Sequence, residues 1–574
     1  MAISDGERQL LTYLNSLYQE GARFREKVSQ DWQRAIKVYK GKIWPENRPS
    51  YKVNATMNFL AQIVERKTAL LTDTKPIASV TSRHKGGILD PVCEILTKTI
   101  DAILSEINWE RKLTELIFLE QLFGLAGLNT CYNQETTDID IVVLDPRSFI
   151  FDPFVVRSWD LNAGEYFCFE TVRPTDYLRD KYASRADDIK PDFSSAPSSD
   201  SSFLSRLYQT FSSFFSHDNQ PFSVVPRSIV RHFWLRDRRT KKDGKLVFPN
   251  WRCITVAGGC VVEDGANPYI DGNLPFDLME WDFNVDSAYG FNEVSKLEMP
   301  QKMFNKVLAT AIENIILMGN AIWIGDYNAL TPEEWERLSN EPGTFIRKRP
   351  GSDLRREPGV PLPPFTINLL SILSTGLEKL SSITEVTEGR RPGQVTSGVG
   401  IEALQLAANT VIRLKARQIE NLIERVGQKL ISRIFQYYTE DRVFSIVGDG
   451  QRFEKFIFER EKIRNALVNA NISPTVAFRD FIFKVVPTSS LALTKWQKGL
   501  MAVQLYQLGA IDREALLEAV EFPNREEILA RTIERQQLGI EPMGVRKGQK
   551  LPRTMLRAGH QETPIQLPQV GGKR

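Results

Sequence analysis

The sequence lacks any apolar run approaching the roughly 20 residues needed to cross a bilayer, and its start lacks the basic end and apolar stretch of a signal peptide. We therefore expect no membrane span and synthesis in the cytoplasm. Cysteine is also scarce and never forms a C-x-x-C pair, which argues against a disulfide framework and a zinc knuckle. The five cysteines, expected to be small buried residues, are Cys93, Cys131, Cys168, Cys253 and Cys260.

Excess charge of one sign is nearly absent. The formal net charge is +3 over 574 residues, whereas proteins that clamp nucleic acid non-specifically concentrate lysine and arginine. Any contact with DNA is therefore expected to be local or weak. The length exceeds what one hydrophobic core usually serves and predicts two to four structural units.

Motifs for catalysis are missing too. No G-x-x-x-x-G-K-[ST] loop occurs, and Gly544–Lys550 has the wrong spacing, so we expect no ATP hydrolysis. The four histidines, predicted to be surface or satisfied residues without a metal, are His84, His217, His232 and His560. Asp138 and Asp140 form a D-x-D that could hold a divalent ion in a nuclease, but they alternate with apolar residues as in a half-buried strand. We expect no enzyme activity, cofactor or metal.

Hydrophobic periodicity predicts a helix-rich α+β fold. Helical patterns cover residues 5–71, with a turn at 44–49, and residues 88–128. Strands are expected, from alternation or aromatic and β-branched content, at 138–143, 149–151, 166–172, 229–235 and, after a hairpin turn at 240–245, at 246–248. A Ser-rich insertion spans 194–223, and its apolar residues predict one amphipathic helix that packs either on a partner or on the same chain.

Two helices with a small module between them form the most informative stretch. A helix of about 28 residues is predicted at 292–319, with Pro300 as a candidate kink. A turn-rich, charged stretch follows at 320–364, and a second helix is predicted at 366–388. This order indicates an antiparallel pair that carries a knob at its tip.

A glycine-rich loop at 389–400 leads into the longest predicted helix, 401–438. Its length is excessive for a compact domain, so we expect it to lie beside helices of other copies of the chain. Strands at 444–447 and 481–486 are expected to return to the earlier sheet. Further helices are predicted at 494–507, 512–520 and 524–537, and a basic, flexible tail begins at 539.

The order of these parts resembles that of the portal proteins of tailed double-stranded DNA bacteriophages, over about residues 20–535. Similar stretches are Asn54–Asn58 with Leu70–Pro76, Leu144–Pro153, Tyr289–Val294 followed by Pro300, Gln301 and Asn305, and Thr396–Ile401. The order of the stretches is more specific than any one of them. The Ser-rich insertion departs from the family's pattern, and so does the short C-terminal end, which is expected to leave no room for a long helical barrel above the crown.

The resemblance implies a portal-type subunit with four kinds of region. They are a wing (1–288, with the insertion, and return strands 441–490), a stem (helices 289–319 and 366–388), a clip (320–365), and a crown (491–538). The tunnel loop would be 389–400, the tunnel-side helix 401–440, and the basic tail 539–574.

The resemblance also implies a function and partners. The chain would form a ring, usually dodecameric, at one capsid vertex of the virion, after synthesis in the host cytoplasm. The ring would conduct double-stranded DNA during packaging and ejection. Its partners would be the terminase large subunit, a head-completion or tail adaptor protein, and the major capsid and scaffolding proteins, without a membrane. The alternatives are another ring-forming head-tail adaptor, or a metal-dependent nuclease that uses Asp138 and Asp140.

Three groups of residues are candidate contact sites. Arg390 and Arg391 could project toward DNA phosphates from the tunnel loop, with Gln394, Thr396 and Ser397, or they could be solvated or paired with Glu385 or Glu388. A clip cluster could receive acidic partner surfaces or be a solvated face: Arg347, Lys348, Arg349, Arg355 and Arg356. The tail could meet DNA or scaffold, or simply be disordered, through Arg546, Lys547, Lys550, Arg553 and Arg557.

Overall fold

The computed structural model describes most of the chain. The described residues are 5–45, 47–50, 52–73, 77–84, 87–192, 225–319, 322–336, 338, 345–357, 361–382, 410–447, 453–473, 476–486 and short pieces between 499 and 517. The chain divides into two units, Met1–Ile446 with Glu454–Ala492, and Val447–Phe453 with Leu493–Arg574. The crown helices predicted in the second unit lie largely outside the described residues, so the description below concerns the first unit.

The N-terminal part is helical, as predicted. Its helices are α1 (Asp5–Tyr39), α2 (Phe59–Thr72), α3 (Asp90–Glu106) and α4 (Trp109–Phe123). The helical pattern predicted for 88–128 is broken where Asn108 adopts a left-handed conformation with φ of 53°. The last residues of that predicted helical stretch belong instead to strand β2 (Leu125–Asn133). Trp32 of α1 is buried and donates its indole N–H to the carbonyl oxygen of Phe123 at 2.8 Å, which joins α1 to the end of α4.

Antiparallel sheets form the rest of this region. One has the order β4 (Phe149–Phe151), β5 (Tyr166–Pro174), β6 (Arg227–Leu235), β7 (Arg252–Ala257) and β8 (Cys260–Ala266). Another has β3 (Asp138–Leu144), β2 and β9 (Phe276–Glu280). The helix α5 (Thr175–Lys181) follows β5, and short 3-10 helices lie at Pro146–Ser148, Leu161–Ala163, Ala183–Arg185 and Ala477–Arg479. The fold therefore mixes helix and sheet, as the predicted α+β class requires.

The hairpin predicted near residue 240 is only partly present. A turn closes with the amide of Lys241 donating to the carbonyl of Lys245 at 2.7 Å, and Thr240 and Leu246 form an isolated bridge. The strand predicted at 246–248 is wrong, because beyond that bridge the amide of Val247 donates to the carbonyl of Arg239 at 2.8 Å, residues 247–250 form bends, and the next strand begins at Arg252.

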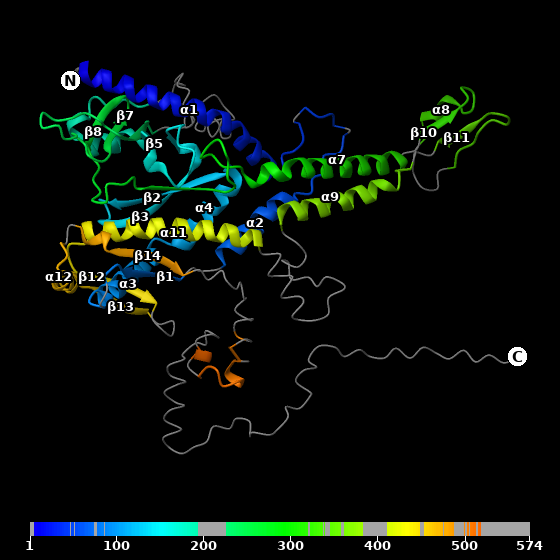
Figure 1. The fold of residues 1–574 in the computed structure, drawn as a ribbon. Coiled ribbons are helices and arrows are strands. Elements are labelled where there is room, and N and C mark those ends of the chain that lie inside the picture. The colour runs from blue at the N-terminus through cyan, green and yellow to red at the C-terminus, as the bar shows by residue number, and fades with distance from the viewer. Residues whose placement is uncertain are drawn as a thin grey trace. The chain divides into compact units, whose positions relative to one another are not determined.

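Two long helices run side by side, α7 (Glu293–Gly319) and α9 (Phe365–Ser381) (Figure 1). Pro300 lies inside α7. Between them in the chain are β10 (Ile322–Gly325), α8 (Pro332–Glu336) and β11 (Leu354–Glu357). The predicted end of the second helix at 388 is wrong, because Ser382 takes a left-handed φ of 59° that stops the helix at Ser381.

The helix α11 (Thr410–Tyr437) is the central helix of the larger core. Its residues from Ile419 to Phe435 pack on α3, on β2 and on β14 (Phe481–Val486), and Ile431 and Ile434 are fully buried. The expectation that this helix exists to lie beside copies of itself is therefore wrong for this part, because its own chain covers the apolar side. The predicted start, 401–409, lies outside the described residues.

The late strands do not return to the earlier sheets, contrary to the prediction. β14 pairs with β1 (Ile77–Ser82), and β12 (Arg442–Val447) pairs with β13 (Phe453–Phe458), each as a two-stranded antiparallel sheet. The helix α12 (Arg460–Asn469) follows. Phe481, Phe483 and Val485 alternate along β14 and are buried in the core that contains α11.

Candidate functional site

The first half of α7 is fixed by two amide side chains to the segment that links α1 to α2. Gln301 accepts a hydrogen bond from the amide of Leu60 at 3.2 Å, and Asn305 accepts one from the amide of Met57 at 2.9 Å. Both side chains are fully buried, and their spacing of four residues places them on one face of the helix. Two stretches singled out in the sequence, 54–58 and 300–305, therefore meet in space.

Glu313 continues this attachment further along α7. Its carboxylate accepts a hydrogen bond from the amide of Val53 at 3.0 Å and forms ion pairs with Arg48 at 3.1 Å and Lys52 at 3.5 Å. The hydrogen bond from Val53 is the largest cause that holds the pKa of Glu313 below its usual value, and the charges of Lys52 and Arg48 act in the same direction. The linker thus holds α7 along about half its length through polar contacts.

A buried ion pair lies at the base of α7. The ammonium group of Lys67 lies 2.7 Å from the carboxylate of Glu293, which also accepts the indole N–H of Trp281 at 2.8 Å. Burial lowers the pKa of Lys67, and Glu293 opposes that shift. The pair connects α2 to the first residue of α7 and so fixes where the helix leaves the sheet region.

Asp282 joins α7 to α11 beside that pair. Its carboxylate contacts Lys296 of α7 and lies 2.9 Å from the ammonium group of Lys415 of α11. Burial raises the pKa of Asp282, but the two lysines outweigh burial and hold it below its ordinary value. A cavity of about 50 Å³ here is also lined by Ser382 and Val411. The two ends of the segment 383–409, which contains the predicted tunnel loop, therefore come together at this junction.

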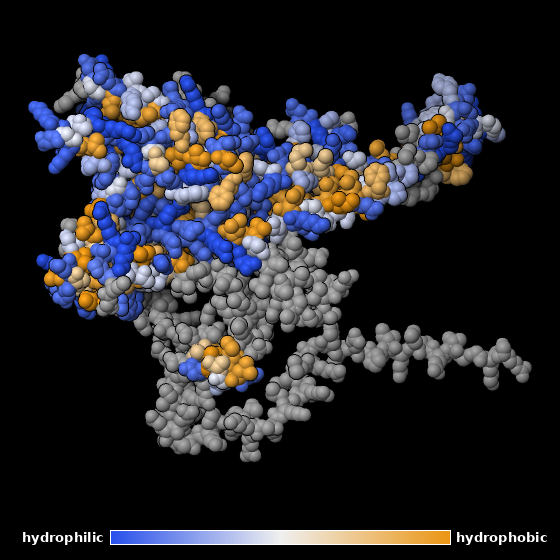
Figure 2. Space-filling model, viewed as in Figure 1, coloured by the Kyte–Doolittle hydropathy of each residue, from blue (hydrophilic) through white to orange (hydrophobic). Residues whose placement is uncertain are grey.

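The far ends of α7 and α9 expose apolar side chains. Ile315 is 63% exposed, Leu317 68% and Ile367 75%. Figure 2 shows hydrophobic residues gathered over this pair of helices. Apolar groups clustered on a protein surface mark a site of interaction.

The small module between α7 and α9 is held by its own contacts. β10 and β11 pair with Trp323 opposite Arg356 and Ile324 opposite Arg355. Thr331 caps α8, since its hydroxyl donates to the carboxylate of Glu334 at 2.9 Å and its amide donates to the same oxygen at 3.0 Å. The sequence prediction of a turn-rich knob thus corresponds to a hairpin and one short helix.

The structure places the five predicted clip residues on this module, and all five are exposed: Arg347, Lys348, Arg349, Arg355 and Arg356. Some of them also make contacts within the module, and the ammonium group of Lys348 donates to the carbonyl oxygen of Ser352 at 3.1 Å. Arg355 lies 3.6 Å from Glu357, and the guanidinium of Arg356 lies 5.9 Å from the centre of the Trp323 ring. These side chains therefore present positive charge to the solvent.

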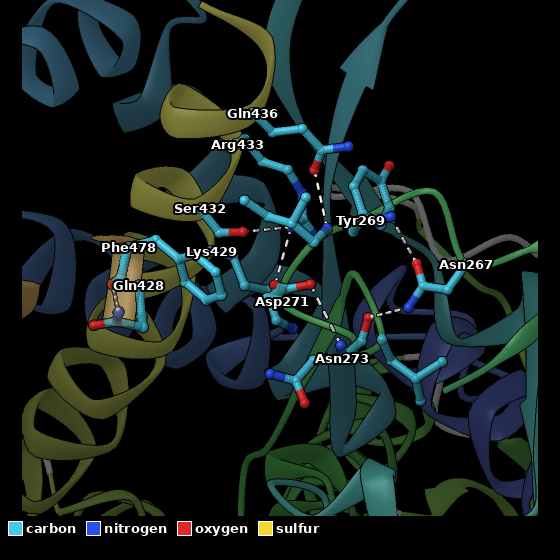
Figure 3. A network of polar contacts seen from close by, with 12 residues as sticks. Asn267, Tyr269, Asp271, Asn273, Gln428, Lys429, Ser432, Arg433, Gln436 and Phe478 are labelled. Atoms are coloured by element: carbon cyan, nitrogen blue, oxygen red, sulfur yellow. Dashed lines mark hydrogen bonds and ion pairs between the residues drawn. The ribbon is translucent and has the colours of Figure 1, made fainter. Parts of the chain in front are cut away.

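A network of polar contacts along α11 was missed by the sequence reasoning (Figure 3). The guanidinium of Arg433 is buried 2.9 Å from Asp271 and lies 3.5 Å from the centre of the Tyr269 ring. One turn earlier, Lys429 lies 2.8 Å from Asp277. Gln436 accepts the amide of Ile270 at 3.1 Å. The sequence did contain a signal for this network: two basic residues, Lys429 and Arg433, are spaced i and i+4 within an apolar helix face. Buried cations need partners, so this spacing indicates buried ion pairs.

The D-x-D pair is used for structure. Asp138 accepts the hydroxyl of Tyr438 at 2.5 Å and pairs with Arg442 at 3.1 Å. Asp140 pairs with Lys112 at 2.5 Å. Across the described part of the chain, no group of three or more His, Cys, Asp and Glu residues could hold a metal ion. The nuclease alternative therefore gains no support.

The other candidate residues for chemistry have ordinary surroundings. His84 lies 3.5 Å from Asp480 at the surface, and His232 stacks on Phe169, where burial lowers its pKa to about 4. Cys93, Cys168 and Cys260 are buried free thiols, as predicted, and Cys131 and Cys253 are partly buried. Among the helices that the structure describes, none is both long and apolar enough to span a membrane.

Two groups of predicted site residues and the Ser-rich insertion lie outside the described residues. They are the tunnel-loop set Arg390, Arg391, Gln394, Thr396 and Ser397 and the tail set Arg546, Lys547, Lys550, Arg553 and Arg557. His217 and His560 lie outside them too.

Comparison with protein-family models shows the family to which this chain is similar. The family model described as Phage P22-like portal protein matches residues 18–569, which is nearly the whole chain. A search of the curated proteins finds no match.

Proposed function

Because the chain belongs to the family of phage P22-like portal proteins, we propose that twelve copies form a ring around a tunnel that conducts double-stranded DNA. Membership implies a structural head-to-tail connector, assembled as a ring at the portal vertex of the capsid. DNA would pass through the tunnel inward during packaging and outward during ejection.

The exposed apolar ends of α7 and α9 are the observation that carries this proposal. A single copy leaves Ile315, Leu317 and Ile367 largely in water, and burying the exposed part of each would contribute about 1–2 kcal/mol. Packing the helix pair of one copy against the pairs of its neighbours would cover these side chains around a closed ring. The pair would then be the stem, formed by residues 289–319 and 366–381.

The other regions follow the order of the chain. The wing would comprise 1–288 and 441–490, which pack around α11, and the clip would comprise 320–365. The tunnel loop would be 389–400, where Arg390 and Arg391 guide DNA with Gln394, Thr396 and Ser397. The crown would be 491–538, and the tail 539–574 would contact DNA or scaffold through its basic residues.

The basic module between the stem helices would be the docking surface. Arg347, Lys348, Arg349, Arg355 and Arg356 would receive an acidic surface of the terminase large subunit during packaging. A head-completion or tail adaptor protein would take the same place afterward. The major capsid protein and the scaffolding protein would be further partners of the assembled ring.

Electron microscopy of the purified chain tests ring formation. We expect end-on rings for the wild type and smaller species for the double variant Ile315→Glu, Leu317→Glu, because both substitutions place charge on the stem surface. Val468→Glu is a matched control, since Val468 on α12 is 63% exposed, as Ile315 is. Rings that survive the double variant, or a wild type that stays monomeric at every salt concentration, would contradict the proposal.

Docking is tested separately by binding of the terminase large subunit to preformed rings. Reversing Arg347, Lys348 and Arg349 to Glu is expected to abolish binding while rings persist. Lys462→Glu, at an exposed position on α12, is the control. Deleting 320–364 distinguishes a portal protein from a simpler ring-forming adaptor. Only a portal protein is expected to keep its ring and lose DNA packaging after this deletion.

A further inference from the structure

A surface pocket of about 480 Å³ is lined by α11, by the stretch that leads into β9, and by the residues that follow β1 and precede β14. Its volume falls within the range of small-molecule sites in proteins. Basic side chains outnumber acidic ones in the lining, with Arg83, Arg425, Lys429 and Arg479 against Asp271 and Asp277. The pocket shares no residue with the clip cluster or with the exposed ends of α7 and α9, so the proposed function leaves it unused.

The pairing of β1 with β14 brings two of these arginines together. Ser82 lies opposite Phe481 in that sheet, and the amide of Arg83 donates to the carbonyl oxygen of Asp480 at 2.8 Å. Arg83 therefore lies beside Arg479, although the two residues are far apart in sequence. Both side chains are exposed, so a ligand in the pocket can reach their guanidinium groups.

Neither of these two arginines forms an ion pair with a residue that the structure describes. The guanidinium of Arg479 lies over the ring of Phe478, 5.6 Å from its centre. The carboxylate of Asp480 is next to Arg479 in the chain, but it lies 3.5 Å from His84 and is not part of the lining. Two neighbouring guanidinium groups repel each other, and an anion between them would remove that repulsion.

The two inner cations share a single carboxylate. Lys429 lies 2.8 Å from Asp277, and the Nε atom of Arg425 lies 3.7 Å from the same carboxylate. Asp271 pairs with Arg433, a further cation behind the lining (Figure 3). Burial lowers the pKa of Lys429, the charge of Asp277 opposes that shift, and Arg433 adds to it. The acidic groups of the pocket thus fall short of neutralising its cations.

Neutral donors complete the lining. Asn162 and Asn273 are exposed, and their side-chain N–H groups donate no hydrogen bond to any residue with a described position. Glu424, on the next turn of α11, lies outside this lining and accepts the amide of Val485 at 3.1 Å. A ligand in the pocket would therefore meet hydrogen-bond donors from several directions.

This donor set fits a phosphate group better than a carboxylate. A carboxylate offers two oxygens in one plane, whereas a terminal phosphate offers three strong acceptor oxygens and a charge of nearly two. The guanidinium fork of arginine matches phosphate oxygens in pairs, and such charge-assisted hydrogen bonds are roughly twice as strong as neutral ones. Two arginine side chains and a lysine can each reach a different side of one phosphate.

We propose that this pocket binds the terminal phosphate of a small molecule, with Arg83 and Arg479 as its outer ligands and Arg425 and Lys429 as its inner ones. The phosphate comes either from an inorganic diphosphate or from a nucleoside diphosphate. The proposal goes beyond the proposed ring and does not depend on it.

Calorimetric titration of the full-length protein with pyrophosphate, at constant ionic strength, tests the site. We expect saturable binding, and we expect Arg83→Gln and Arg479→Gln each to weaken it by at least about tenfold, the loss typical of one charge-assisted hydrogen bond. Arg464→Gln is the matched control, because Arg464 on α12 is also an exposed arginine and lies outside the lining. Its affinity should equal that of the wild type.

The two arginine variants should fold normally, because both side chains are exposed and make no ion pair with the described residues. An unchanged midpoint of urea unfolding would attribute the loss of binding to the site itself. Equal affinity for pyrophosphate in Arg83→Gln, Arg479→Gln and Arg464→Gln would overturn the proposal. So would a wild type without saturable binding.

Titration with ADP distinguishes the two sources. ADP should bind more tightly than pyrophosphate if a nucleotide is the natural ligand, and no more tightly if the ligand is inorganic. Both arginine variants should weaken either ligand. A DNA duplex without terminal phosphates should leave bound pyrophosphate in place. If such a duplex displaces pyrophosphate from the wild type, the site recognises the DNA backbone and the assignment to a terminal phosphate is wrong.

Discussion

Replacing Lys67 by methionine should destabilise the base of α7 strongly. The ammonium group is buried 2.7 Å from Glu293, and both side chains are less than a tenth exposed. Removing one partner of a buried ion pair typically costs about 3–5 kcal/mol, because it leaves an unpaired charge. In this variant Glu293 still accepts the indole N–H of Trp281. It also lies at the N-terminus of α7, where the helix dipole stabilises its negative charge by about 1 kcal/mol. The expected net loss is therefore about 2–4 kcal/mol.

Urea unfolding followed by tryptophan fluorescence measures this loss. Lys98→Met is the matched control, because Lys98 forms an exposed pair with Glu94 at 2.7 Å, and water screens such a pair so well that its removal should leave the free energy of unfolding nearly unchanged. The double variant Lys67→Met, Glu293→Gln removes the stranded charge and should recover much of the stability. A loss below about 1 kcal/mol in Lys67→Met, or a double variant no more stable than the single one, would refute the reasoning.

Three further predictions concern packing and pH. Gly427→Ala should lower the free energy of unfolding, measured by thermal unfolding, by about 1–3 kcal/mol, because a Cβ there would lie 2.2 Å from the Phe483 ring. Gly376→Ala is the control: the space around Gly376 is open, so this variant should be neutral or stabilising. In the folded protein the pKa of His232 is about 4, below its unfolded value near 6.5. The stability that the neutral ring contributes should therefore be present above pH 6.5 and lost as the pH falls toward 4. In melting curves, His232→Phe should not show this loss. Glu280 has a folded pKa of about 7, above its unfolded value, so stability falls as the pH rises through that range, and Glu280→Gln should melt higher than the wild type at pH 8 and not at pH 4.

Local patterns were enough to predict the elements whose apolar period is long and regular. The helix predicted at 292–319 is α7, and the strands predicted at 149–151 and 481–486 have the bounds that the structure gives. The ends of helices depended on the backbone conformation of single residues, which the periodicity of apolar residues does not predict. Asn108 and Ser382 both end or interrupt helices through a positive φ, although neither is a glycine.

Pairing between distant segments could not be predicted from local patterns. β1 and β14 are about 400 residues apart in the chain, and the aromatic alternation of β14 fits any apolar surface equally well. The ion pairs of the α11 cations could not be predicted, because their acidic partners lie in the stretch 271–282, far away in sequence. Gln301 and Asn305 were noticed only through the family resemblance, and their role as anchors for the linker needed the fold.

The burial of α11 changes where the free energy of ring assembly must come from. Its apolar residues from Ile419 to Phe435 are already covered by the same chain, so neighbouring copies gain little by packing there. The exposed apolar side chains at the ends of α7 and α9 remain; α7 is fixed to the body by buried polar contacts at Gln301, Asn305 and Glu293, and α9 packs along α7. Buried polar contacts lose much of their value when geometry is distorted, whereas apolar contacts tolerate sliding. If this helix pair is the proposed stem, its root would stay fixed in each subunit while its outer surface would adapt to its neighbours.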